Sequence, residues 1–170
     1  PHANSLSYDA ERRKVMVSLF YLDAIAQIDR DTATLDWLLG GPESDWTVEG
    51  DGFAGQHGPA MLDGGRRLVL MDNGPLSSGG KPAEARAYTL DPDAMTATEH
   101  WTFDDGAIHS GVILGNVSWL GEDAAVVNWG SAGVIQQVNA SGEIRMQLDF
   151  GLSEFAEFSE HITDLAGATR

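Results

Sequence analysis

The order of short apolar runs along the chain repeats three times, and this repeat restricts the folds that are available to the sequence. Each repeat holds four runs of four to six residues, separated by connecting segments. The expected strands are residues 5–8, 15–19, 25–29 and 34–38, then 59–62, 68–71, 86–91 and 98–101, and finally 116–120, 125–129, 134–139 and 144–148. Short strands in this order predict an all-β protein made of four-stranded antiparallel units.

Two properties of the runs sharpen this prediction. The third run of each repeat ends in an Asp or Asn, namely Asp29, Asp91 and Asn139. These side chains can accept hydrogen bonds from the backbone of the following turn. The second runs are nearly all apolar, which is typical of strands buried on both faces. Four antiparallel strands recurring about every 45–60 residues indicate the blades of a β-propeller, which closes with about four to eight blades. We therefore expect about three blades, near residues 1–40, 56–103 and 110–150, of a larger propeller.

Three stretches fall outside the repeat. Residues 40–55 and 74–85 are rich in Gly, Pro, Ser and acidic residues, and we interpret them as loops. Residues 151–170 have no clear strand pattern, so they form a tail, a short amphipathic helix or the start of a further blade. The chain begins at Pro1 with neither a Met nor a signal segment, and we expect it to be a piece of a longer protein.

The charge of the chain excludes two classes of partner. Lys and Arg number 10 against 26 Asp and Glu, which gives a formal net charge of −16. Such an acidic surface repels phosphate groups, so we expect neither nucleic acid nor an anionic membrane as a partner. No apolar run reaches the ~18 residues of a transmembrane helix. The absence of Cys excludes disulfides, thiol catalysis and thiolate metal sites.

Three of the five histidines occupy the same place in the repeat. His2, His57 and His109 each precede the first strand of their segment. Because the innermost strand of each propeller blade lines the central channel, these imidazoles are expected to converge on one spot. They would form a functional cluster; the alternatives are three independent turn caps or a three-imidazole zinc site. We interpret His100, beside Trp101, as a surface or packing residue.

Seven short motifs, in their order and spacing, resemble the arylsulfotransferase family, the PAPS-independent aryl-sulfate sulfotransferases. They are HANSLSYD at 2–9, IDRDT at 28–32, WLLGG at 37–41, QHGPA at 56–60, DNG at 72–74, RAYTLD at 86–91 and NWG at 128–130. The resemblance covers roughly residues 1–150 and implies a six-bladed propeller that is periplasmic or secreted. It also implies sulfuryl transfer from a phenolic sulfate ester to a phenolic acceptor through a sulfo-histidine intermediate, without a cofactor.

The resemblance assigns roles to six residues. His2 and His57 match two of the channel histidines of the family, and His109 falls in the blade where the nucleophilic His is expected. The implied substrate-binding residues are Arg86, Asn4 and Asn73. One departure stands against the match: many relatives carry Ser-Ser-Arg-His in the second strand of the first blade, whereas residues 17–21 read VSLFY and contain no Arg.

The residue types suit this chemistry, and two rivals remain. Sulfuryl transfer needs positioning and charge stabilisation around the equatorial oxygens. A neutral imidazole can act as nucleophile, and a second imidazole can protonate the departing phenolate. The first rival is a propeller that serves as a non-catalytic binding or scaffold module, which the missing Arg favours. The second is a quinoprotein-type dehydrogenase, which would hold calcium and a quinone.

Overall fold

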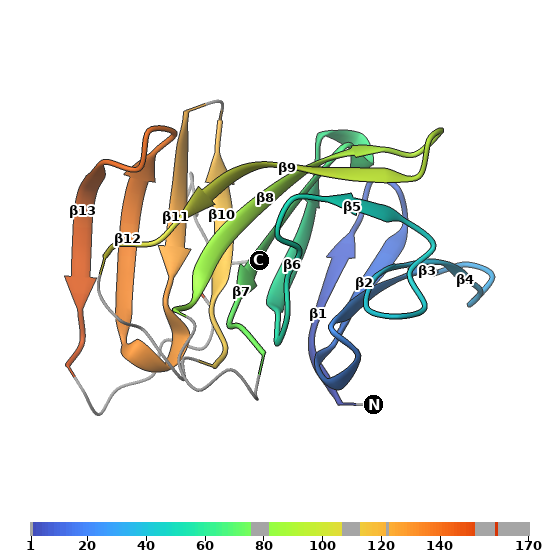
Figure 1. The fold of residues 1–170 in the computed structure, drawn as a ribbon, viewed down its shortest axis with the longest axis horizontal. Helices are drawn as coiled ribbons and strands as arrows, with labels where there is room; N and C mark the ends of the chain where they lie inside the picture. Colours follow the sequence, from blue (N-terminus) through green and yellow to red (C-terminus); the bar gives the residue numbers. More distant parts are fainter. Residues whose placement is uncertain (1, 76–81, 107–112, 122, 152–158, 160–170) are drawn as a thin grey trace, which may run out of the picture.

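The computed structural model describes residues 2–75, 82–106, 113–121, 123–151 and 159, and these form three sheets (Figure 1). The first sheet contains, in spatial order, β1 (Ala3–Asp9), β2 (Lys14–Leu19), β3 (Ala24–Asp29) and β4 (Leu35–Gly40). The second contains β6 (His57–Leu62), β7 (Arg67–Asp72), β8 (Glu84–Asp91), β9 (Thr96–Phe103) and, at its outer edge, β5 (Thr47–Glu49). The third contains β10 (Asn116–Leu120), β11 (Ala124–Asn128), β12 (Val134–Asn139) and β13 (Ile144–Asp149).

All twelve predicted strands are present, and the all-β class is confirmed. Within the described residues the helical structure consists of three short 3-10 turns, η1 (Phe20–Leu22), η2 (Asp63–Gly65) and η3 (Gly130–Ala132). In this described part, no helix has the length and apolar character needed to cross a membrane. The described strands form three separate sheets, and the closed propeller stays a prediction.

One strand was not predicted. Residues 40–55 were expected to form a loop, but β5 lies within them and pairs in parallel with β9, with Thr47 opposite Thr96. Trp46 anchors this strand, because its ring packs edge-on against Trp37 with 5.4 Å between the ring centroids. A strand of three residues is too short to show an alternating pattern in the sequence. The predicted loop 74–85 also ends earlier than expected, since β8 begins at Glu84.

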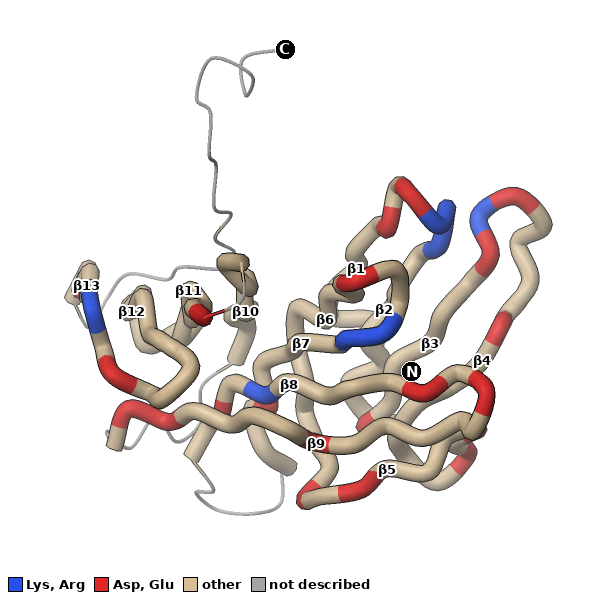
Figure 2. The backbone as a smooth tube through the Cα atoms, turned by 90° about the horizontal axis from the view of Figure 1, so that it is seen from above, with Lys and Arg blue, Asp and Glu red and all other residues tan. Residues whose placement is uncertain are grey.

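The first strands of the three sheets lie near one another, and the later strands lie farther out (Figure 2). Strand β6 contacts β1 on one side and β10 on the other. The middle sheet is therefore buried on both faces. Leu68 and Leu70 of β7 face the first sheet, whereas Val69 and Met71 face the third. This double burial explains the unbroken apolar run that the sequence shows at 68–71.

The turns after the third strands confirm the expected side-chain contacts. Oδ1 of Asp29 accepts hydrogen bonds from the backbone N–H of Asp31 and Thr32, at 2.9 and 2.8 Å. The carboxylate of Asp91 does the same for the turn that follows β8. Asn139 accepts from the backbone of Ser141 and Glu143. The same short polar side chain thus fixes the same turn in all three sheets.

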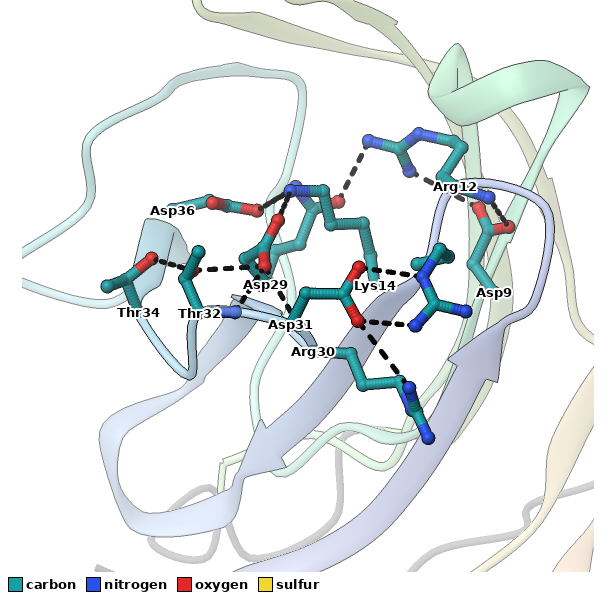
Figure 3. A network of polar contacts seen from close by, with 11 residues as sticks. Asp9, Arg12, Lys14, Asp29, Arg30, Asp31, Thr32, Thr34 and Asp36 are labelled. Atoms are coloured by element: carbon teal, nitrogen blue, oxygen red, sulfur yellow. Dashed lines mark hydrogen bonds and ion pairs between the residues drawn. The ribbon is translucent and has the colours of Figure 1, made fainter.

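Asp29 also belongs to a group of ion pairs on the first sheet (Figure 3). The Lys14 ammonium lies 2.7 Å from a carboxylate oxygen of Asp29 and 2.9 Å from one of Asp36. The hydrogen bond from Lys14, followed by the bonds from Thr32, holds the pKa of Asp29 well below its usual range. Both carboxylates in turn raise the pKa of Lys14. The ionised form of Asp29 therefore favours the folded state.

We expect Asp29→Asn to remove a stabilising contribution that depends on pH. An unfolded Asp titrates near about pH 4. The ionised carboxylate of Asp29 therefore stabilises the fold above that pH, and the contribution disappears as the pH falls through the lower folded-state pKa. Asparagine keeps the turn-forming Oδ1 atom but loses the charge. In thermal melts, the difference in melting temperature between the wild-type protein and Asp29→Asn should be largest near pH 7 and should decrease below pH 4.

Asp91→Asn is the matched control, because Asp91 holds the equivalent turn and has no ion pair among the described residues. The difference in pH dependence between Asp29→Asn and Asp91→Asn therefore isolates the ion pair with Lys14. Equal pH dependence in the two variants would contradict the assignment of the effect to Lys14.

Candidate functional site

A cavity of about 300 Å³ lies where the first strands of the three sheets begin. It combines two imidazoles, two amides and an apolar wall. Its lining residues are His2, Asn4, Phe20, Tyr21, His57, Asn73, Ile113 and Leu114. Four of the six residues that the sequence pointed to therefore meet here, although they are far apart along the chain. His109 lies outside the described residues, and its predicted role stays a prediction.

Side chains of β1 hold the backbone of β6 at this cavity. The amide nitrogen of Asn4 donates to the carbonyl oxygen of Gln56 at 2.7 Å. Ser5 accepts a hydrogen bond from the backbone N–H of Gly58. Ser7 donates to the carbonyl oxygen of Pro59 at 2.6 Å. These three polar residues of β1 thus replace the backbone ladder that would otherwise join two neighbouring strands.

The opposite side of β6 is held by the segment that leads into β10. Nδ1 of His57 lies 2.7 Å from the carbonyl oxygen of Gly115, and the His57 side chain is largely buried. The approach is close because residue 58 is a glycine with φ of +57°. A Cβ atom there would lie 2.6 Å from Cβ of Asn116 and 2.7 Å from the oxygen of Gly115. Only glycine lets β6 come near enough for this contact.

The contact with Gly115 fixes the tautomer of the neutral His57 ring. A carbonyl oxygen can only accept a hydrogen bond, so Nδ1 of His57 carries the proton and donates it. The lone pair of the neutral imidazole then lies on Nε2, on the opposite side of the ring. Nε2 makes no hydrogen bond within the described residues. A histidine held in this way can present a nucleophile or a base to a ligand in the cavity.

The two asparagines of the cavity share an unusual property. The amide nitrogen of Asn73 donates to the carbonyl oxygen of Leu114 at 3.2 Å, just as that of Asn4 donates to Gln56. These contacts fix the orientation of both amides, because an amide oxygen in the place of the nitrogen would face a second acceptor. The Oδ1 atoms of Asn4 and Asn73 are buried and have no partner in the described part of the chain. A buried acceptor without a donor costs about 1–3 kcal/mol.

An apolar wall completes the cavity, and the sequence reasoning missed it. Phe20 and Tyr21 come from η1, and His2 packs against both rings at 5.9 Å between centroids. Ile113 and Leu114 close the side near β10. The aromatic pair lies in the VSLFY stretch at residues 17–21. The sequence shows that this stretch lacks an Arg, but only the fold shows that its two rings reach the cavity.

Arg86 was predicted to bind substrate, but it does not line this cavity. Its side chain is 1% exposed and is surrounded by carboxylates. Nε donates to Asp72 at 2.8 Å, and the two terminal nitrogens donate to Glu84 and Glu99. Burial opposes the charge of Arg86, yet Asp72 and the other acidic neighbours outweigh it and raise the pKa of the guanidinium. The partners of Arg86 in the structure are therefore the carboxylates of an internal ion-pair network.

Through Asp72, this network reaches the wall of the cavity. The second oxygen of Asp72 accepts hydrogen bonds from the backbone N–H of Ala54 and of Gly74, both at 3.0 Å. Asn73 lies between Asp72 and Gly74 in the chain. Arg86 thus orients the carboxylate that fixes the backbone on which Asn73 is placed.

The described lining of the cavity holds no side chain with a fixed charge. Among the described residues that line the cavity there is no Lys, Arg, Asp or Glu. The described part of the chain also contains no group of three His, Asp or Glu side chains that could hold a metal ion. An anionic ligand here would rely on protonated histidine and on hydrogen-bond donors for its stabilisation.

These features define an all-β protein of three sheets, each of four or five strands, with a histidine-containing cavity at the start of the first strands. The family model for Arylsulfotransferase (ASST) matches residues 1–162, and the chain therefore belongs to the arylsulfotransferase family. No curated protein matches the chain.

We predict that neutral His57 is protonated on Nδ1. The hydrogen bond to the Gly115 carbonyl favours this tautomer over the one with the proton on Nε2. Nitrogen-15 NMR of imidazole-labelled protein above the titration range of the ring should show a proton on Nδ1 and a bare Nε2. A His57 signal with the proton on Nε2 would contradict the assignment.

We predict that Arg86 contributes strongly to stability. Arg86→Met removes the guanidinium that three carboxylates share in a buried setting, and the free energy of unfolding should fall by about 3 kcal/mol or more. Chemical denaturation measures this directly. Arg145→Met is the control, because Arg145 pairs with Glu143 on the exposed surface and its loss should change stability little. Equal effects of the two substitutions would contradict a structural role for Arg86.

Proposed function

We propose that this protein transfers a sulfuryl group from a phenolic sulfate ester to a phenolic acceptor through a sulfo-histidine intermediate. Membership of the arylsulfotransferase family supports the transferase class. The observation that carries the proposal is the cavity in which His2 and His57 meet beside an aromatic wall. Such a cavity offers an aryl ring apolar contacts and offers the ester group imidazoles.

The proposed reaction has two balanced steps. In the first, the lone pair of an imidazole nitrogen attacks the sulfur atom, the bond between sulfur and the aryl oxygen breaks, and a second imidazolium gives its proton to the departing phenolate. In the second, the acceptor phenol gives its proton to that imidazole while its oxygen attacks the sulfur, and the nitrogen–sulfur bond breaks. The imidazoles in these roles are His2, His57 and His109, of which His57 presents Nε2 to the ligand.

A non-catalytic binding module is the second candidate. Its support is the residue 17–21 stretch, where the structure places Phe20 and Tyr21 on the cavity wall in the part of the chain where relatives carry an Arg. An aromatic wall binds a ring well but does little for a sulfate charge. This candidate predicts binding of aryl compounds without transfer.

The test measures sulfuryl transfer from 4-nitrophenyl sulfate to phenol, and the release of 4-nitrophenol reports the rate. The intact protein should catalyse it, and His57→Ala should lower the rate by about 10²-fold or more because an acid–base or nucleophilic group is lost. His2→Ala and His109→Ala should also lower it.

His100→Ala is the matched control, since His100 lies exposed on β9, where it contacts Thr89 and Trp119. This variant should keep the wild-type rate. Full activity of His57→Ala would overturn the proposed mechanism. A wild-type protein that binds phenol without transferring sulfate would support the binding module instead.

A further inference from the structure

We infer that Asp23 is a positioning residue, which holds the aromatic wall of the cavity in place and thereby sets the size of aryl group that the cavity prefers. The inference rests on the proposed function for the aryl nature of the ligand. Asp23 itself does not line the cavity. The observation behind its role is the hydrogen bond, 2.8 Å long, that Oδ1 of Asp23 accepts from the backbone N–H of Gly55.

The turn that carries the aromatic wall is poorly anchored by burial. Phe20 and Tyr21 belong to η1, and none of the three residues of this turn is buried. The Tyr21 side chain is on the surface, with 68% of the residue exposed. The position of the two rings therefore depends on the polar contacts of the turn. One of them joins the backbone N–H of Phe20 to the carbonyl oxygen of His2 at 2.8 Å, and Asp23 supplies another at the end of the turn.

The contact made by Asp23 joins this turn to the segment that leads into β6. Gly55 is buried and lies two residues before His57. A Cβ atom on Gly55 would lie 3.4 Å from Cε2 of Phe20 and 2.4 Å from the carbonyl oxygen of Gly74. The backbone of Gly55 is therefore packed between the aromatic ring and the segment after β7. By holding Gly55, Asp23 fixes the aromatic wall relative to His57.

The same segment is held from the second sheet by a different carboxylate. The N–H of Ala54, the neighbour of Gly55, donates to Asp72 at 3.0 Å. Asp72 precedes Asn73, which lines the cavity. Asp23 and Asp72 thus hold different walls through neighbouring residues of one segment. Loss of Asp23 releases the aromatic wall and leaves the wall at Asn73 in place, so the cavity widens.

A wider cavity changes which ring fits. Without the Asp23 carboxylate, the N–H of Gly55 is a buried donor that has lost its acceptor, and an outward shift of the turn that admits water relieves this cost. A gap of about 1 Å already removes up to about half of the dispersion energy between two packed atoms. A single ring therefore loses its contact with the wall, whereas a larger ring system spans more of the widened space.

The backbone of Asp23 limits the variants that can test this role, because its φ of +47° lies in the left-handed region. Asp23→Gly removes the carboxylate and adopts this backbone without strain. Asp23→Asn keeps an acceptor oxygen and also tolerates the left-handed region. Asp63→Gly is the matched control, because Asp63 also has a positive φ, of +52°, within a 3-10 turn. Its carboxylate pairs with Arg67 at 3.0 Å, and neither residue lines the cavity.

Calorimetric titration of the intact protein and its variants with phenol and with 2-naphthol measures the size preference. Asp23→Gly should bind phenol about tenfold more weakly than the wild-type protein does, since losing contact over about 50–60 Å² of apolar surface corresponds to that factor. Its affinity for 2-naphthol should fall by about threefold or less, because the larger ring keeps more of its buried surface. The ratio of the two affinities should therefore shift towards 2-naphthol. Asp23→Asn and Asp63→Gly should keep the wild-type ratio.

Each other outcome overturns the inference. An unchanged ratio in Asp23→Gly shows that the wall does not depend on Asp23. A shift in Asp23→Asn equal to that in Asp23→Gly shows that the charge matters and the acceptor atom does not. A wild-type protein that binds neither phenol nor 2-naphthol has no aryl preference for Asp23 to set.

Circular dichroism checks that the variants fold, and Asp23→Ser is the second variant that loses the contact. Its hydroxyl oxygen lies one bond nearer to the backbone and falls short of Gly55, so the ratio should shift in the same direction as in Asp23→Gly. If both variants fail to fold while Asp63→Gly folds, the carboxylate serves the whole fold, and a role confined to the wall is overturned.

These binding measurements separate the positioning role from the proposed function. A protein that transfers sulfate but keeps its size preference in Asp23→Gly contradicts only the role of Asp23. A protein whose preference shifts as expected but which transfers nothing contradicts only the proposed transfer.

Discussion

The backbone of residues 56–59 is held from both sides by side chains, and the arrangement of the three sheets at the cavity depends on this. From the first sheet, Asn4, Ser5 and Ser7 bond to the backbone at 56, 58 and 59. On the other side, His57 reaches the backbone of Gly115. Each of these bonds joins a side chain of one sheet to the backbone of the next, so the sheets are positioned by residue type and not by a continuous ladder. The same bonds place two of the polar residues that line the cavity.

A second network, of buried ion pairs, fixes part of the backbone next to the site. Arg86 on β8 orients Asp72 at the end of β7, and Asp72 accepts hydrogen bonds from the backbone N–H groups of Ala54 and of Gly74, which follows the lining residue Asn73. In a chain of net charge −16, a buried guanidinium concentrates carboxylates inside the protein as well as on its surface. An ion-pair network of this kind fixes one conformation, because any shift leaves a buried charge without its partner.

The sequence predicted the strands and the turns well, because these follow from local patterns. The apolar run at 68–71 and the Asp or Asn at each third-strand end can be interpreted without knowing the neighbours. The repeat and the family resemblance also predicted that His2, His57, Asn4 and Asn73 belong to one site. It could not predict β5, since three residues show no periodicity. It could not tell a substrate-binding arginine from an internal one either, because the carboxylates around Arg86 come from three strand positions that only the fold assembles.

The cavity differs from an ordinary anion site in how little fixed positive charge it holds. Arg86 is committed to carboxylates, and the stretch at 17–21 contributes rings. Among the described lining residues, the imidazoles are the side chains that could carry a positive charge. In apolar surroundings each proton and each hydrogen bond has a larger effect than in water, because the low local dielectric strengthens both attraction and the penalty for an unpaired group.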